Sequence, residues 1–184
     1  MKKLYFVTSN ENKFKEASKI LSNYNIHVYL KKLELIETQS DDLGMIASAK
    51  ARDAWKALHN SVIVEDDGLF IDALEGFPGP YSAFVYRTID NEGILKLMKG
   101  VANRKATFMS IIAYCNRNFT PLIFKGAVKG KISKKQRGRS WGYDPIFIPN
   151  NSAGLTYAEL KSNKNMISHR RLALEHFAEW YTSI

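Results

Sequence analysis

The sequence predicts an α/β fold in which helices cover a mixed β-sheet. Three observations indicate this fold. Short apolar runs alternate with helical periodicity near the start of the chain, two long stretches rich in β-branched and aromatic residues follow in its second half, and an amphipathic helix closes it. No internal repeat, low-complexity tract or linker marks a second domain, so a single domain over residues 1–184 is expected.

The first third of the chain predicts the order strand, helix, strand, helix, strand. Asp41 or Asp42 precedes the second helix as its N-cap, and the third strand is buried and expected to stop at the acidic residues that follow it. The five elements are expected at Leu4–Val7, 12–21, 27–30, 42–58 and 62–64.

The rest of the chain predicts a turn, a helix, a hairpin and a last helix. Gly76–Pro80 is rich in glycine and proline and reads as a rigid turn. The two β-rich stretches are separated by Asn116–Asn118, which favours a long antiparallel hairpin and therefore a mixed sheet. The helix, the two strands of the hairpin and the last helix are expected at 91–98, 106–114, 122–132 and 168–181.

The formal net charge of +9 attracts polyanions of any kind, including nucleic acid, anionic membranes and free nucleotides. Seven lysine and arginine residues and no acid lie between Lys125 and Arg139. This stretch either binds nucleic acid or is the solvated face of a hairpin, and the second interpretation is favoured.

No stretch approaches the roughly 20 apolar residues that a membrane helix needs, and the apolar run after Met1 is too short for a signal peptide. A soluble, cytoplasmic protein that binds no membrane is expected. Cys115 is the only cysteine, which excludes an intrachain disulfide and a cysteine-based zinc site. It lies in an apolar run, so we expect a buried strand residue rather than a nucleophile.

The polar turn after the first strand is a candidate phosphate site. The N-terminus of a helix presents backbone N–H groups and the positive end of its dipole to an anion, and Lys13 could add a full charge. The turn has no glycine-rich phosphate loop, so an ordinary capped helix is the alternative. The candidate residues are Thr8, Ser9, Asn10, Glu11, Asn12 and Lys13.

The acidic cluster Glu65–Asp67, together with Glu37, is a candidate metal site. Adjacent carboxylates repel one another, and a hard divalent ion such as Mg²⁺ offsets that repulsion. The alternative is a solvated acidic turn. A position at the carboxyl end of a strand in an α/β sheet favours the metal site, because ligands usually bind there.

Trp141–Asp144 is a candidate base site. Trp141 and Tyr143 flank Gly142 and could stack on a flat base, while Asp144 could accept hydrogen bonds from the base. Aromatic stacking does not choose among bases, so polar groups must do so. The alternative is that both rings belong to the core.

A further polar group lies at the start of the last helix. Ser168 could cap that helix, and His169 and Arg170 would then lie at its positive end, where cationic side chains need an anion or polar ligand to offset them. Lys164 lies just before them. A structural histidine is the alternative.

These motifs, taken in order, resemble the inosine triphosphate pyrophosphatases, also called dITP/XTP pyrophosphatases, and their archaeal members most closely. The similarity runs nearly end to end. It rests on Thr8–Lys13, Leu35–Gln39, Ala49–Arg52, Glu65–Leu69, Gly76–Ser82, Trp141–Pro145 and Ile167–Arg170.

The resemblance implies an elongated mixed-sheet fold with two lobes around a central cleft, and a homodimer. It also implies Mg²⁺-dependent hydrolysis of the deaminated purine triphosphates ITP, dITP and XTP to monophosphate and pyrophosphate. Asp66 matches the general base and a metal ligand, and Glu37 matches a second metal ligand. The residues that match phosphate and base contacts are Lys13, Lys50, Trp141, Tyr143, Asp144, Lys164, His169 and Arg170.

One position departs from the family pattern. Asp67 replaces the serine that commonly follows the catalytic aspartate, and an ionised carboxylate cannot donate a hydrogen bond to a substrate. Asp67 could instead reinforce the metal site. Two other hypotheses stay open: a nucleic-acid-binding module that uses residues 125–139, and a septum-inhibition-type pyrophosphatase, against which the Trp141–Asp144 and Ser168–Arg170 motifs argue.

Overall fold

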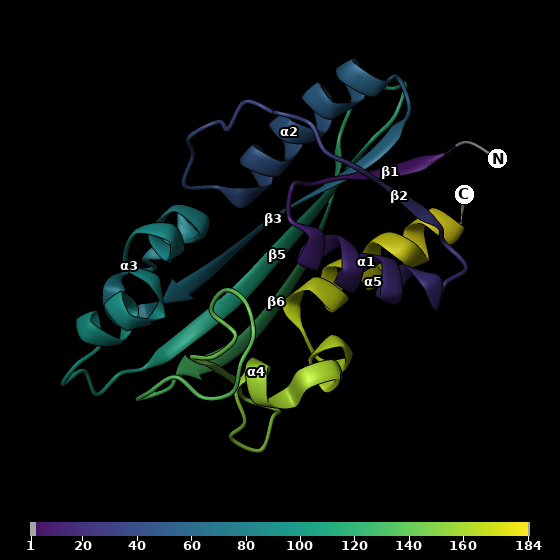
Figure 1. The fold of residues 1–184 in the computed structure, drawn as a ribbon. Coiled ribbons are helices and arrows are strands. Elements are labelled where there is room, and N and C mark those ends of the chain that lie inside the picture. Colours follow the sequence, from purple (N-terminus) through teal and green to yellow (C-terminus); the bar gives the residue numbers. More distant parts are fainter. Residues whose placement is uncertain (1–2, 184) are drawn as a thin grey trace. The chain divides into compact units, whose positions relative to one another are not determined.

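The computed structural model describes residues 3–183 and confirms an α/β fold with a mixed sheet of seven strands (Figure 1). The strand order is β2-β1-β3-β5-β6-β7, and β4 pairs with β3. The strands are β1 Leu4–Val7, β2 Val28–Lys31, β3 Ser61–Ile71, β4 Pro78–Gly79, β5 Lys105–Cys115, β6 Leu122–Ile132 and β7 Phe147–Pro149. The helices are α1 Glu11–Ser22, α2 Leu43–Leu58, α3 Ser82–Leu97, α4 Tyr157–Leu160 and α5 His169–Thr182, with 3₁₀ turns η1 Asp72–Leu74 and η2 Lys161–Met166.

The described residues form two compact units, each assembled from separate stretches of chain. Unit 1 holds the residues up to Asp66, residues 110–126, and the residues from Arg170 onward. Unit 2 holds residues 67–109 and 127–169. Each unit therefore depends on contacts between segments that are far apart in sequence.

Unit 1 is built on three parallel strands. β1 pairs with β2 on one side, with Leu4 opposite Val28, and with β3 on the other side, with Leu4 opposite Ser61. β1 lies between β2 and β3, so the chain moves to one side of β1 to form β2 and then to the other side to form β3. Ligands in such sheets bind beside the carboxyl ends of the strands at this switch point, where the turn after β1 begins.

Helices cover both faces of the strands of unit 1, with α1 and α5 on one face and α2 on the other (Figure 1). The main apolar cluster joins Phe6 and Ile63 of the strands to Ile20 of α1 and Phe177 of α5. The buried side chains of α2, which include Ala47 and Ala51, lie outside that cluster. The predicted helices are confirmed, and Asp42 is the N-cap of α2 because its carboxylate accepts the N–H groups of Gly44 and Met45.

The prediction that the third strand stops at Glu65 is wrong, because β3 continues through all three acids to Ile71. Successive side chains of a strand point to opposite faces. Glu65 therefore meets Arg170 of α5, whereas Asp66 meets Lys50 of α2, on the other face. Glu65 and Asp66 therefore each have their own cation, which offsets these two charges on the strand.

Unit 2 packs around aromatic rings that come from distant parts of the chain. The Phe108 ring lies edge-on to the Phe147 ring, and Tyr157 contacts both of them. β7 is antiparallel to β6, with Ile148 opposite Lys131, and β4 is antiparallel to β3, with Gly79 opposite Leu69. The Ser82 hydroxyl joins β4 to β3, because it donates to the Gly79 carbonyl and accepts the N–H of Leu69.

The helix predicted at 91–98 begins earlier, at Ser82, and is broken in its middle. Asp90 has φ 55° and ψ −170°, so α3 consists of two helical segments joined by a kink. Residues 82–89 were missed because Gly76–Pro80 precedes them as a turn and β-branched Val85, Thr88 and Ile89 weaken the helical pattern.

The predicted hairpin strands are confirmed, since β5 and β6 are hydrogen-bonded neighbours joined by residues 116–121. Along the second half of β6, exposed Lys125, Lys129 and Lys131 alternate with buried residues, which favours the solvated-strand interpretation of the basic stretch. Cys115 is buried at the end of β5, as predicted, and burial raises the pKa of its thiol. Over residues 3–183, no helix is both long and apolar enough to cross a membrane.

Candidate functional site

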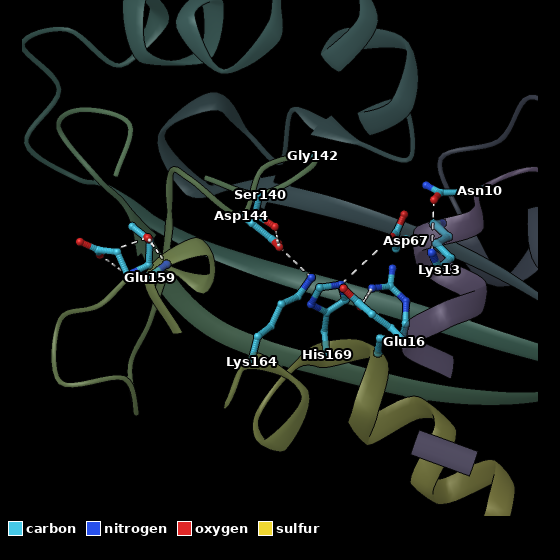
Figure 2. Close-up of polar contacts among 12 residues, drawn as sticks. Asn10, Lys13, Glu16, Asp67, Ser140, Gly142, Asp144, Glu159, Lys164 and His169 are labelled. Atoms are coloured by element: carbon cyan, nitrogen blue, oxygen red, sulfur yellow. Dashed lines mark hydrogen bonds and ion pairs between the residues drawn. The ribbon is translucent and has the colours of Figure 1, made fainter. Parts of the chain in front are cut away.

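The turn between β1 and α1 is rigidly hydrogen-bonded. The Asn10 side chain is the N-cap of α1 and accepts the backbone N–H groups of Asn12 and Lys13 at 3.0 and 3.2 Å. The Thr8 hydroxyl accepts the Asn10 N–H at 3.1 Å. Figure 2 shows Asn10 above the first turn of α1, over the Lys13 N–H. Three of the predicted phosphate-binding amides are thus bonded within the turn, so side-chain charge must supply most of the attraction for an anion.

Lys50 joins the two predicted metal ligands. Its Nζ atom lies 2.7 Å from Asp66 Oδ1 and 3.3 Å from Glu37 Oε1. The side chains of Lys50 and Asp66 are mostly buried, whereas that of Glu37 is 81% exposed on the segment before α2. One lysine cation therefore pairs with both carboxylates.

Those two carboxylates also suit Mg²⁺ chemically. Mg²⁺ prefers oxygen ligands and is usually held by one or two protein carboxylates plus substrate phosphates. Within the described part of the chain, no group of three or more His, Cys, Asp or Glu side chains is placed to hold a metal ion. A metal ion held by Glu37 and Asp66 would therefore need substrate or water oxygens to complete its ligands.

Glu65 and Arg170 form a fully buried ion pair in unit 1. Arg170 Nε lies 2.8 Å from Glu65 Oε2, and the same guanidinium pairs with Glu16 of α1. The Ser110 hydroxyl donates to Glu65 Oε1 at 2.8 Å. The Glu65 and Glu16 carboxylates offset the positive charge that Arg170 brings to the start of α5. Both oxygens of Glu65 accept hydrogen bonds from Arg170, and Oε1 also accepts one from Ser110.

Unit 2 contains a second buried ion pair, between Asp144 and Lys164. Lys164 Nζ and the Ser140 hydroxyl each donate to Asp144 Oδ2 at 2.8 Å (Figure 2). Both side chains of the ion pair are only 5% exposed, and Lys164 Nζ lies 4.8 Å from the centre of the Trp141 ring. A carboxylate acceptor, an ammonium donor and an aromatic ring are therefore gathered at one place.

The remaining residues of that motif differ in exposure. Trp141 and Gly142 are half-buried, whereas Tyr143 is buried, lies edge-on to Tyr86 and donates its hydroxyl to the Ser82 carbonyl at 2.9 Å. Burial raises the pKa of Tyr143. Trp141 thus fits the predicted stacking role more readily, and the stacking role of Tyr143 stays a prediction.

His169 lies flat against Phe108 in unit 2. The two rings are 4.0 Å apart and within 5° of parallel, which fixes the plane of the imidazole. Its Nε2 atom is 4.0 Å from Asp67 Oδ2, and Figure 2 shows the two side chains facing each other. Asp67, the departure from the family pattern, is thus placed to interact with His169.

A family model described as the Ham1 family matches residues 4–180. The chain belongs to the Ham1 family. Among curated relatives, the dITP/XTP pyrophosphatase of Methanopyrus kandleri is 51% identical over 97% of this chain and 96% of its own length. The proteins of the same name from Methanosarcina acetivorans and Thermococcus kodakarensis are each 45% identical, and cover 100% and 97% of this chain and 99% and 96% of their own lengths.

Solved structures agree with this assignment. A HAM1 protein from Coxiella burnetii has a TM-score of 0.87 to this Ham1 chain, with 30% identity over 100% of both chains. The Staphylococcus aureus Ham1 protein has a TM-score of 0.83 with 28% identity, over 98% of this chain and 99% of its own.

The predicted residues of this Ham1 chain fall into two sets. Unit 1 brings together Glu37, Lys50 and Asp66, and also holds Thr8–Lys13 and Arg170. Unit 2 brings Trp141 and Asp144 to Lys164, and Asp67 to His169. The sequence did not reveal the supporting residues, because their partners are distant in the chain and nothing local marks them. These residues are Glu16, Ser110, Phe108, Ser140 and Asn91.

Proposed function

We propose that this Ham1 protein hydrolyses deaminated purine nucleoside triphosphates, namely ITP, dITP and XTP, to the monophosphate and pyrophosphate. The observation that carries the proposal is the near full-length identity of 45–51% to proteins named dITP/XTP pyrophosphatase. The two sets of polar residues support it, because such a substrate needs cations for its phosphates and a polar, aromatic site for its base.

The residues of unit 1 suit the phosphate chemistry. Lys13 and Lys50 bring positive charge toward the phosphates, and Glu37 and Asp66 would hold Mg²⁺. When bound, Mg²⁺ would offset charge that develops on the phosphate oxygens and on the leaving pyrophosphate. Asp66 accepts a proton from the attacking water, the water oxygen bonds to phosphorus, and the bond between the α and β phosphates breaks.

The residues of unit 2 suit the base. Hypoxanthine and xanthine present an acceptor at O6 and a donor at N1, and the buried Lys164 and Asp144 offer a donor and an acceptor in return. Adenine presents the reverse pattern and would leave the buried ion pair mismatched. Trp141 adds a ring for stacking, which supplies affinity for any base.

Base selectivity is the direct test of this function. We expect kcat/KM for ITP and XTP to exceed that for ATP by on the order of 10⁴, because a buried polar site rejects a base whose donors and acceptors are reversed. Pyrophosphate release from ITP, XTP, dITP, GTP, ATP and dUTP, measured at equal concentrations, tests this expectation. Equal hydrolysis of all the purine triphosphates would refute it.

The metal role predicts a specific magnesium dependence. Hydrolysis of ITP should cease in EDTA and return with Mg²⁺, and the Glu37→Gln variant should need several-fold more free Mg²⁺ for half-maximal rate, because it loses one carboxylate ligand. Titration of free Mg²⁺ at fixed ITP measures both effects. Glu34→Gln, an exposed change on the same segment, is the matched control. Identical titration curves for the two variants would remove Glu37 from the metal site.

We also propose a cytoplasmic homodimer that does not bind nucleic acid. The family resemblance supports the first part. The match of residues 4–180 to the Ham1 family supports the second, since the relatives of this chain are named for an activity on free nucleotides.

A further inference from the structure

The kink at Asp90 in α3 is a strained part of the backbone that lies outside the residues assigned to the proposed function. Asp90 has a left-handed φ of 55°, and its carboxylate accepts the backbone N–H of Asn91, which closes the kink. Gly93 is required there, since a Cβ at that position would collide with the Ile89 side chain. Non-glycine residues persist in such conformations only where the surrounding structure holds them, and they cluster at functional sites.

Asn91, directly after the kink, reaches the loop that contains Trp141 and Asp144. Its side chain is buried, with 2% of the residue exposed, and its Nδ2 atom donates to the Gly142 carbonyl at 3.0 Å. Its Oδ1 atom is buried with no hydrogen-bond partner among the described residues. Burying an unsatisfied amide oxygen costs free energy. Among the described residues, the bond to Gly142 is the polar contact that offsets this cost.

The backbone of Gly142 contacts α3 through both its carbonyl and its N–H group. Tyr86, on the first segment of α3, accepts a hydrogen bond from the Gly142 backbone, while burial and Asp90 raise the pKa of its hydroxyl. Gly142 itself has φ +61°, a conformation that glycine adopts without strain. The backbone contacts between Gly142 and α3 therefore help to fix the orientation of the neighbouring residues Trp141 and Tyr143.

We propose that Asn91 is a positioning residue for base recognition, which fixes the Gly142 peptide and through it the orientation of Trp141 and Asp144. This inference rests on the proposed function, because it assumes that those two residues meet the purine. The kink lies directly before Asn91, whose carboxamide reaches Gly142. The proposed phosphate chemistry is assigned to other residues, so the chemical step should not depend on Asn91 directly.

The test compares Asn91→Leu and Asn91→Ser with the wild type. Leucine has a similar size and cannot donate a hydrogen bond, whereas serine is too short to reach Gly142 but leaves space for water. Both variants should raise KM for ITP about tenfold and change kcat less than threefold, because a misplaced base site weakens binding more than the chemistry. The ratio of kcat/KM for ITP to that for ATP should fall in both variants. Ile94→Val, a buried change on the same segment of α3, is the matched control and should leave KM unchanged.

The outcomes separate the two proposals. An unchanged KM and unchanged ITP selectivity in either folded Asn91 variant overturns the positioning role. A loss of kcat with KM unchanged also overturns it. If the wild type itself does not prefer ITP over ATP, the proposed function fails. Thermal unfolding of both variants establishes that they are folded at the assay temperature, and Asn91→Ser supplies the comparison if Asn91→Leu is not.

Discussion

Replacing Asp66 with asparagine is expected to lower kcat for ITP by about a hundredfold or more, because the amide cannot accept the proton of the attacking water. The change is nearly isosteric, so the position of the side chain beside Lys50 at 2.7 Å need not alter. Steady-state pyrophosphate release at saturating Mg²⁺ measures the effect. A KM within a few-fold of the wild type would show that Asp66 acts in the transition state rather than in binding.

Asp53→Asn is the control for charge alone. Asp53 lies on α2, where it pairs with Lys56 at 3.2 Å, and its side chain is 38% exposed. That variant should hydrolyse ITP at the wild-type rate. Near-wild-type turnover by Asp66→Asn would remove Asp66 from the role of base, and the two remaining acids of β3 would then need testing.

The largest effect on stability is expected from Arg170→Met. Among the described residues, the change leaves the buried Glu65 carboxylate with the Ser110 hydroxyl as its remaining partner, and it also removes the cation that pairs with Glu16. Breaking a buried ion pair in this way costs about 3–5 kcal/mol. For a chain of this size, the unfolding midpoint should fall by on the order of 10 °C. Differential scanning calorimetry or thermal circular dichroism measures the shift.

Two further variants distinguish a buried ion pair from general damage to α5. Arg171→Met breaks a pair with Glu175 on the same helix, in which each side chain is 21% exposed, and should change stability by less than about 1 kcal/mol. The double variant Glu65→Leu/Arg170→Met removes both buried charges and should recover most of the loss. A double variant no more stable than Arg170→Met alone would show that the ion pair itself is not what unit 1 depends on.

The sequence allowed most of unit 1 to be predicted, because its signals are local. The helix at α1 follows from apolar residues at helical spacing after a capping asparagine, and that at α2 from a similar pattern after Asp42. β1 and the first half of β3 are short apolar runs. In each case the residues that decide the structure lie within a few positions of one another.

The errors arose where distant residues decide. The strand before the acids was expected to end at Glu65, since acids are rare in strands, and the cation that donates to the Glu65 carboxylate lies 105 positions away in Arg170. The kink of α3 at Asp90 comes directly before Asn91, whose partner Gly142 lies 51 positions further along the chain, and no periodicity can reveal such a contact. The candidate site residues were chosen by chemistry and resemblance, whereas their supporting partners could be found only in three dimensions.

The opposite orientations of Glu65 and Asp66 on β3 have an evolutionary consequence. Adding or deleting one residue ahead of these acids would exchange the two faces, which would turn the Glu65 side chain toward Lys50 and the Asp66 side chain toward Arg170. A second substitution can compensate for a point substitution near these acids, but it cannot compensate for a change in the length of the strand. We therefore expect the spacing between the start of β3 and its acids to be invariant among Ham1 proteins, even where the flanking apolar residues drift.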